Sequence, residues 1–365
     1  MKTVIFLCSY LFIKGIACYI LTKQENEALA QICGLYGREM GGQVPRIERK
    51  VLRGKNADIK DAPWSVAIKV AKLGNRHRHS ICTGTLISPW HVLTARHCFM
   101  QETEDGLSWV NDDAPIDWRM CKKRDYFVPQ KVLKQTQIVF ETTCGTKKAC
   151  KAYRIPLPKV KRRAKSIVLL DICPFQRWHF APPDVAIIEL AEEIKFNEKA
   201  HPVCLLNNET LVDEDSLIQL FGYGDDPSLG KGTKGRLRYE LSRKEEHKDH
   251  GDRWVVTHSI SKKNLACRGD SGAGSIVKIN NRFTIHGVLS RGDPCESATL
   301  SSTDHLSSVA FLVDRICEYT GICQIEYSTN HTTKGFYDEN SGKSQIFHPF
   351  LFLPIVFLFK ILNFQ

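Results

Sequence analysis

The sequence predicts an all-β protein, because short strand-like runs recur along the chain and are not separated by helices. The runs are rich in β-branched and aromatic residues, and they end at Gly, Pro and Asp turns. No internal repeat is visible. Many short strands of this kind indicate a sandwich or a barrel. The clearest runs lie at residues 63–71, 82–88, 91–95, 184–190, 216–224, 253–260, 274–279 and 283–290.

The composition favours an extracellular globular protein. The chain has 365 residues, which is enough for one large two-part domain or two ordinary ones. Fourteen cysteines are more than a typical cytosolic protein carries, and they indicate an oxidising compartment. The formal net charge is +11, and its distribution along the chain matters more than its sum.

The N-terminus is typical of a secretory signal peptide. A lysine is followed by an apolar run that ends at Cys18, and a polar stretch comes next. We therefore expect a signal peptide at residues 1–18, cleaved near Ala17 or Cys18, and a secreted chain. Sequons at Asn208 and Asn330 are then available for glycosylation.

The C-terminal residues 326–365 form a polar linker and a hydrophobic tail. The longest uninterrupted apolar stretch, Phe350 to Phe359, is too short to span a bilayer. Small residues at Ser341 and Gly342, a polar spacer and a terminal apolar tail resemble a lipid-anchor attachment signal. An uncleaved, adhesive tail is the alternative.

A strongly basic segment runs from Thr142 to Leu170, and it contains no acidic residue. One interpretation is a solvated loop. The other is an electrostatic binding surface for sulfated glycans or for acidic lipid headgroups of a membrane. Nucleic acid is not an expected partner, because few aromatic residues are interleaved with the charges and the chain has secretory features.

Three motifs supply the parts of an activated serine nucleophile. A serine hydroxyl needs a base, the base is usually a histidine held by a buried carboxylate, and the oxyanion needs backbone N–H groups. "HVLTARHC" places His97 after an apolar run, "PPDVAIIEL" places Asp184 before a hydrophobic strand, and "GDSG" places Ser271 on a glycine-flanked turn. Each alone has a structural explanation, but together they indicate a catalytic triad.

With "TARHC", "DVAII" and "GDSGAG", the sequence resembles the chymotrypsin/trypsin-like serine protease family, as a divergent secreted member. The resemblance covers Val51 to Cys323. It implies two six-stranded antiparallel β-barrels and a C-terminal helix, with the triad in the cleft between the barrels. The peptidase domain is then residues 51–325. The long interval between the histidine and the aspartate indicates a basic, Cys-containing insertion at about 119–175. A serine endopeptidase of this kind needs no cofactor and no metal.

The resemblance also implies a precursor that another protease activates. Pro63 lies twelve residues after Val51, which matches the family's spacing from the new N-terminus. The activation bond is then Lys50–Val51, and residues 19–50 are the pro-segment. The freed ammonium group of Val51 would pair with Asp270, the residue before the nucleophile.

The residues around the nucleophile receive roles from the same resemblance. The N–H groups of Gly269 and Ser271 form the oxyanion hole. Leu265 stands where a carboxylate would receive a Lys or Arg side chain, so apolar residues before the cut are expected. The specificity pocket is assigned to Leu265, Ser290, Gly292 and Ser308.

The family's disulfides can be transferred to eight of the cysteines. The implied pairs are Cys33–Cys204, Cys82–Cys98, Cys267–Cys295 and Cys317–Cys323. Cys121, Cys144, Cys150 and Cys173 remain, and they allow three connectivities. A further family disulfide is absent, because its positions hold Ile218 and Val277.

Departures from the family pattern leave other functions open. Arg96 replaces a small residue before His97, and Arg291 replaces a tryptophan. The main alternative is therefore a catalytically weak or inactive protease-like binding protein that acts through its basic insertion. A third hypothesis is cell adhesion through the Arg-Gly-Asp tripeptides at residues 268–270 and 291–293. We interpret both tripeptides as incidental, because Asp270 of the first is needed inside the protein and the second overlaps Ser290–Gly292, a segment whose family counterpart binds substrate backbone.

Overall fold

The fold was analysed in a computed structural model of the chain. The predicted signal peptide, activation bond and C-terminal tail lie outside the residues that the structure describes, as do Cys121, Leu265, Cys295 and Asn330. The described residues are 19–40, 55–72, 75–104, 106–110, 114–117, 119, 124–173, 182–225, 234–245, 252–260, 266–293 and 303–324.

The first half of the chain forms a closed antiparallel barrel. Its strands follow the order β10-β4-β3-β2-β8-β9, and the pairing of β9 with β10 closes it. These strands are β2 (Ser65–Lys72), β3 (Asn75–Leu86), β4 (His91–Thr94), β8 (Thr136–Val139), β9 (Lys161–Leu169) and β10 (Ala186–Leu190). Attached to this barrel are β5 (Met100–Thr103), β6 (Gly106–Trp109), β7 (Tyr126–Phe127), α2 (Gln130–Leu133) and α3 (Lys147–Ala152).

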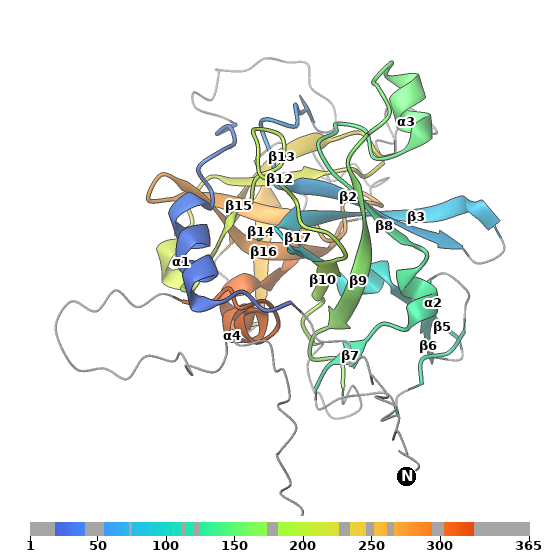
Figure 1. Ribbon diagram of the computed structural model, residues 1–365. Coiled ribbons are helices and arrows are strands. Elements are labelled where there is room, and N and C mark those ends of the chain that lie inside the picture. The colour runs from blue at the N-terminus through green and yellow to red at the C-terminus, as the bar shows by residue number, and fades with distance from the viewer. Residues whose placement is uncertain are drawn as a thin grey trace, which may run out of the picture.

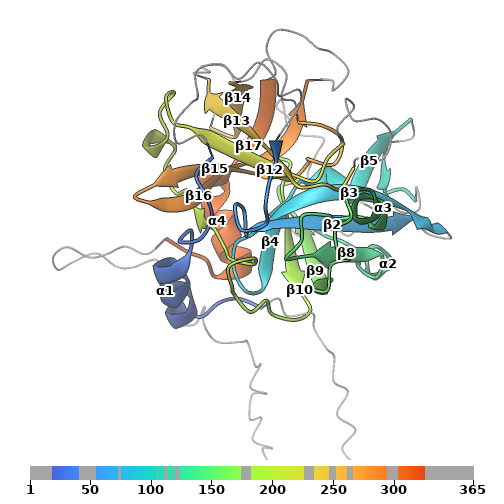
Figure 2. The ribbon, with the colours of Figure 1, turned by 90° about the horizontal axis from the view of Figure 1, so that it is seen from above.

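The second half forms another closed barrel, followed by a helix (Figures 1 and 2). The strand order is β13-β12-β15-β16-β17-β14, and β13 pairs with β14 to close it. The strands are β12 (Ile218–Gly222), β13 (Arg238–Lys244), β14 (Trp254–Ser259), β15 (Gly274–Ile279), β16 (Arg282–Gly292) and β17 (Thr303–Ser308). β1 (Lys55–Asn56) pairs with β13, β11 (Cys204–Leu205) pairs with β16, and α4 (Val309–Thr320) follows β17. Two six-stranded barrels and a C-terminal helix confirm the predicted fold class.

One apolar core extends across both barrels. Trp64, which leads into β2 of the first barrel, packs edge-on against Phe221 of β12, with ring centroids 5.9 Å apart. It also contacts Phe283 of β16, at 5.0 Å. Trp64 is 1% exposed, and buried aromatic side chains contribute much of the packing energy of a core. This shared core fixes the two barrels against each other and therefore fixes any site that lies between them.

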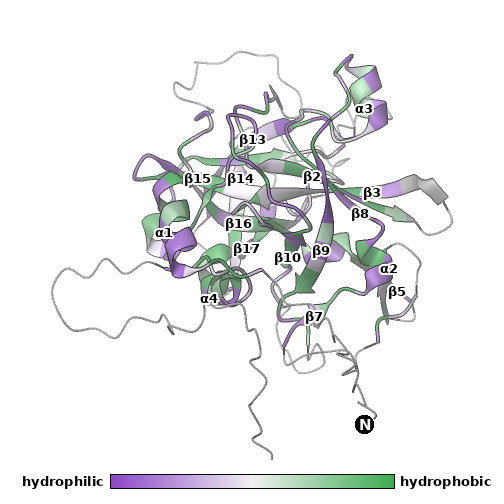
Figure 3. Cartoon of the chain, viewed as in Figure 1, coloured by the Kyte–Doolittle hydropathy of each residue, from purple (hydrophilic) through white to green (hydrophobic). Residues whose placement is uncertain are grey.

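The basic segment does not lie in a free loop, since part of it forms strand β9 of the first barrel. Along β9 the side chains of Lys161, Arg163 and Lys165 are exposed, whereas the last four residues are buried. Figure 3 shows the strand changing from hydrophilic to hydrophobic along its length. Charged residues on the solvent face hide the alternation that would identify a strand in the sequence, and pairing with β8 and β10 determines its conformation.

The segment before the predicted activation bond packs against the second barrel. Helix α1 (Lys23–Ile32) begins at Thr22, whose side chain and that of Glu25 form a reciprocal capping box. Asn26 donates from Nδ2 to the carbonyl oxygen of Cys323, just beyond α4, and α1 lies beside α4 in Figure 1. No helix within the described ranges is long and apolar enough to cross a membrane.

Four disulfides are present within the described residues: Cys33–Cys204, Cys82–Cys98, Cys144–Cys150 and Cys317–Cys323. Cys173 and Cys267 are also disulfide-bonded. The Cys144–Cys150 bond selects one of the three connectivities that the sequence leaves open. Ile218 and Val277 lie in one buried apolar cluster, so packing takes the place of the family's disulfide there.

Candidate active site

Strand pairing brings the histidine and aspartate motifs together. His97 lies in a single 3₁₀ turn, η1 (Arg96–Cys98), directly after β4. Asp184 lies just before β10, and β10 pairs antiparallel with β4, with Ala186 opposite Thr94. The start of one strand therefore lies beside the end of the other. Ser271 comes from the turn before β15 of the second barrel.

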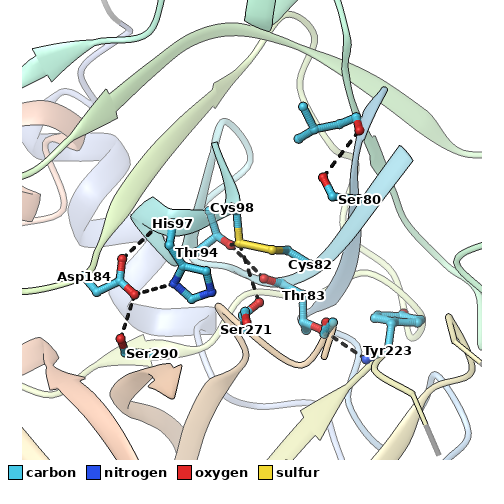
Figure 4. The surroundings of a disulfide bond; sticks show 12 residues. Ser80, Cys82, Thr83, Thr94, His97, Cys98, Asp184, Tyr223, Ser271 and Ser290 are labelled. Carbon is cyan, nitrogen blue, oxygen red and sulfur yellow. Dashed lines mark hydrogen bonds and ion pairs between the residues drawn. A yellow bond between two sulfur atoms is a disulfide. The ribbon is translucent and has the colours of Figure 1, made fainter. Parts of the chain in front are cut away.

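The carboxylate of Asp184 contacts the imidazole of His97 directly (Figure 4). Its Oδ2 lies 2.5 Å from Nδ1 of His97, and its Oδ1 accepts the backbone N–H of His97 at 3.0 Å. The hydroxyl of Ser290 donates to the same Oδ2 at 2.7 Å, and the N–H of Asp184 donates to Ser307 Oγ at 2.8 Å. These bonds fix the ring and leave its Nε2 facing the other way, toward the side on which Figure 4 places Ser271.

The electrostatics of the pair suit a general base. Burial acts to lower the pKa of His97, but the charge and hydrogen bond of Asp184 outweigh it and raise the pKa above its ordinary value. Burial acts to raise the pKa of Asp184, but His97, Arg96 and Ser290 hold it well below its usual range. Arg96 lies 3.9 Å from Asp184 Oδ1 and opposes the rise in the His97 pKa. The aspartate therefore stays ionised while the histidine can titrate.

The turn that carries Ser271 is held by the first barrel. Thr83 of β3 donates its N–H to the Ser271 carbonyl at 2.9 Å and its hydroxyl to the Gly269 carbonyl at 2.9 Å. Within the described part of the chain, the N–H groups of Gly269 and Ser271 have no acceptor. Gly272 has φ +83°, and a Cβ there would lie 2.2 Å from Thr94 Oγ1, so the motif requires glycine. The turn thus presents two free N–H donors beside the serine.

Asp270 is buried behind this turn. Its carboxylate accepts the N–H groups of Gly224 at 2.7 Å and of Cys267 at 2.8 Å. A Cβ on Gly222 would lie 2.0 Å from Asp270 Oδ1, and one on Gly224 would lie 2.3 Å from Oδ2. The two glycines of the "FGYG" stretch therefore make room for this side chain. Because Asp270 is only 7% exposed, the first Arg-Gly-Asp tripeptide is poorly placed for adhesion.

The residues assigned to the specificity pocket do not all lie together. Ser308 pairs with Gly287, caps α4 and donates its hydroxyl to Glu209 at 2.6 Å, so it does not line the same space as Gly292. Asp304 lies opposite Gly292 instead. The sequence could not show that Ser308 lies apart from Gly292, because nothing in the local sequence marks where β17 begins.

Some contacts at the site have no clear signature in the sequence. Thr83 lies in a run that reads only as a strand, and Ser307 is separated from Asp184 by 123 residues. A buried hydroxyl on a strand is usually satisfied locally, so only the folded structure shows that these two hold the site.

Asn208, the sequon within the described residues, is exposed at the surface. No group of three or more His, Cys, Asp or Glu side chains in the described ranges is arranged to hold a metal ion.

Comparison with known proteins agrees with this geometry. A model of the nematode trypsin-6-like family matches residues 3–323. The chain belongs to this family. Among curated proteins, the chain is 30% identical to the trypsin-like protease try-5 of Caenorhabditis elegans over 171 residues, which are 46% of this chain and 51% of that protein.

More distant relatives are matched over a greater length. The CLIP domain-containing serine protease HP8 of Bombyx mori is 25% identical over 282 residues, covering 73% of this chain and 66% of that protein. The serine protease ea of Drosophila melanogaster is 25% identical over 268 residues, covering 68% and 62%. The chain thus spans between about half and two thirds of the length of these relatives, all of which are named as proteases.

Proposed function

We propose that this chain is the precursor of a secreted serine endopeptidase. The observation that carries the proposal is the contact of the buried Asp184 with His97, beside a serine whose own turn offers two free N–H groups. In this mechanism His97 removes the proton of the Ser271 hydroxyl as its oxygen attacks the scissile carbonyl. The N–H groups of Gly269 and Ser271 bind the oxyanion, and His97 then protonates the leaving amine.

Activation would follow cleavage of the Lys50–Val51 bond. The new ammonium group of Val51 would enter beside Asp270, whose buried carboxylate already accepts two backbone N–H groups. A buried carboxylate gains most from a positive partner, because the low dielectric strengthens the interaction. The disulfide Cys33–Cys204 would keep the pro-segment attached to the enzyme after the cut.

The relatives suggest where the enzyme acts and on what. One of them, HP8 of Bombyx mori, is named as a CLIP domain-containing serine protease, and we infer by analogy that this chain cleaves protein substrates and is itself cut by another protease. The disulfides support an extracellular location. The alternative of an inactive binding protein is less favoured, because the triad atoms are all present and Asp184 retains its contacts with His97.

The test is to remove the nucleophile alone. The protein cut at Lys50–Val51, through an introduced enteropeptidase site ending at Lys50, should hydrolyse a peptide library, whereas Ser271→Ala should not. Both should unfold at the same urea concentration, because the substitution removes one partly exposed hydroxyl. Hydrolysis by Ser271→Ala at the wild-type rate would show that the catalytic assignment is wrong.

A second proposed function is the binding of an anionic polymer on the first barrel. Lys69 of β2, Lys147 of α3 and Lys161 of β9 come from three elements, and none has an acidic partner within the described residues. Burial, together with the charges of Lys161 and Lys147, lowers the pKa of Lys69 to about 8. Like charges held this close favour an anionic ligand such as a sulfated glycan.

This surface can be tested on a heparin column. Lys147→Ala together with Lys161→Ala should lower the salt concentration needed for elution, since exposed charges are screened at a Debye length of about 8 Å in physiological salt. Arg162→Ala is the matched control, because Arg162 is already paired with Glu192 at 3.6 Å. If the double variant eluted at the same salt concentration as the wild type, these lysines would be ordinary solvated surface residues and the binding proposal would be wrong.

A further inference from the structure

Two buried carboxyl groups lie in the second barrel, and each has one oxygen without a hydrogen-bond partner within the described residues. Asp304 of β17 is 1% exposed and Glu240 of β13 is 5% exposed. Their side chains are hydrogen-bonded to each other. Within the described residues, Asp304 Oδ2 and Glu240 Oε1 have no hydrogen-bond partner. A buried carboxyl oxygen without a donor is costly, so the pair needs an explanation beyond packing.

Asp304 lies beside Gly292, a residue that the family resemblance assigns to the specificity pocket. It pairs with Gly292 across β16 and β17, and directly paired residues project from the same face of a sheet. A Cβ on Gly292 would lie 2.5 Å from Asp304 Oδ1 and 3.7 Å from Cβ of Ala266. The carboxylate therefore lies against the backbone of Gly292, and Ala266, the residue after Leu265 in the chain, lies close to the same point.

We propose that Asp304 is the specificity-determining residue of this enzyme and receives a Lys or Arg side chain of the substrate. The proposal rests on the proposed peptidase function. It replaces the apolar preference expected from Leu265, because a negative charge is supplied by β17 rather than by the position of that leucine. A guanidinium or ammonium group would give Asp304 Oδ2 the donor it lacks. An apolar side chain would leave that oxygen buried and unpaired.

Three other acidic side chains affect the charge of Asp304. Glu240 lies on β13, Asp270 lies on the turn before β15, and Asp293 lies just after β16. Burial raises the pKa of Asp304 to about 7, and burial together with Asp304 raises that of Glu240 well above its ordinary range. A bound cation favours the ionised carboxylates, so its binding should expel a proton and strengthen as the pH rises toward neutrality.

Asp304 is almost fully buried in the uncleaved chain, so a substrate side chain could reach it only after a local change. The experiment therefore uses the protein cut at Lys50–Val51. Its kcat/KM is measured on peptides that differ only in having Arg, Lys, Leu or Ala before the cut. Binding of benzamidine, a small aromatic amidinium, is measured by calorimetry from pH 5 to 8. Labelling of Ser271 by a fluorophosphonate reports the catalytic machinery separately.

The wild-type enzyme should prefer Arg or Lys over Leu, and Asp304→Asn should lose about 10²-fold or more on the basic peptides while retaining fluorophosphonate labelling. Glu240→Gln should keep the basic preference but reduce proton release on benzamidine binding. Asp293→Asn, which removes a nearby charge, should change the ratio only slightly. A higher kcat/KM for Leu than for Arg, or an unchanged ratio in Asp304→Asn, would overturn the proposal.

Different results would contradict the proposed peptidase function and the proposed role of Asp304. Absence of fluorophosphonate labelling in the cut wild-type protein would contradict the peptidase function. Benzamidine binding would still decide the role of Asp304. Binding that is lost in Asp304→Asn would support the cation site, and equal or absent binding in both proteins would refute it.

Discussion

Thr83 offers the sharpest test of how the first barrel supports the site on the second. Its hydroxyl donates to the Gly269 carbonyl at 2.9 Å and accepts the N–H of Tyr223 at 3.0 Å. The side chain is fully buried, so water cannot replace it. Thr83→Val has nearly the same shape and removes only these two bonds, whereas Thr83→Ser keeps both.

The expected loss of stability follows from the two groups that Thr83→Val leaves without partners. A buried carbonyl or N–H that loses its partner costs about 1–3 kcal/mol, so the free energy of unfolding should fall by about 2–6 kcal/mol. Thr83→Ser should lose about 1 kcal/mol for its missing methyl group. The Gly269 carbonyl also fixes the backbone that orients the proposed oxyanion donors. The kcat of the valine variant should therefore fall by about tenfold or more, up to the 10²–10³ that one such donor contributes.

The assay combines urea unfolding with steady-state hydrolysis by the protein cut at Lys50–Val51. The account predicts that Thr83→Val lowers both stability and kcat with little change in KM, while Thr83→Ser remains close to wild type. If Thr83→Val were as stable and as active as Thr83→Ser, the Thr83 hydroxyl would not be holding the turn, and the reasoning would be refuted.

Three other substitutions test separate parts of the structure. Arg96→Ala should shift the acidic limb of the kcat/KM profile to higher pH, because Arg96 lowers the pKa of His97 and activity needs the neutral ring; a shift to lower pH would be inconsistent. Glu189→Gln should reduce the free energy of unfolding by about 1–3 kcal/mol in urea, since the 2% exposed carboxylate accepts from the Ser166 hydroxyl at 2.8 Å and from the exposed Lys165 at 2.7 Å. A loss below 1 kcal/mol would show that the pair is not coupled to folding. Gly224→Ala should abolish hydrolysis by displacing the carboxylate of the residue before the nucleophile, and full activity would contradict the close contact at 2.3 Å.

The sequence predicted the fold well and also singled out the residues of the proposed triad, because both depend on local patterns. In "HVLTARHC" a buried strand ends shortly before His97, and in "DVAIIEL" a buried strand begins shortly after Asp184. The pairing of β4 with β10 then brings the two residues together. The strand at 161–169 was harder to predict, since its solvent face is charged and its strand conformation depends on pairing with its neighbours. A strand is therefore hard to predict where charged residues hide the alternation of apolar and polar side chains.

The specificity pocket was the least predictable part. The walls that we propose lie on β16 and β17, and no fixed spacing in the sequence places Asp304 opposite Gly292. An aspartate between a threonine and a histidine reads as a turn residue, although it is almost fully buried. Burial of a charged side chain depends on the register of distant strands, and a single sequence does not reveal that register.

The central claim is that Ser271 is a nucleophile activated by His97 and Asp184 once the Lys50–Val51 bond is cut. Labelling with a fluorophosphonate, followed by peptide mapping, tests it most directly. The account predicts near-complete labelling at Ser271 in the cut protein, much slower labelling in the uncut protein, and none in Ser271→Ala or His97→Ala. A cut protein that stays unlabelled, or that is labelled at another residue, would contradict the claim.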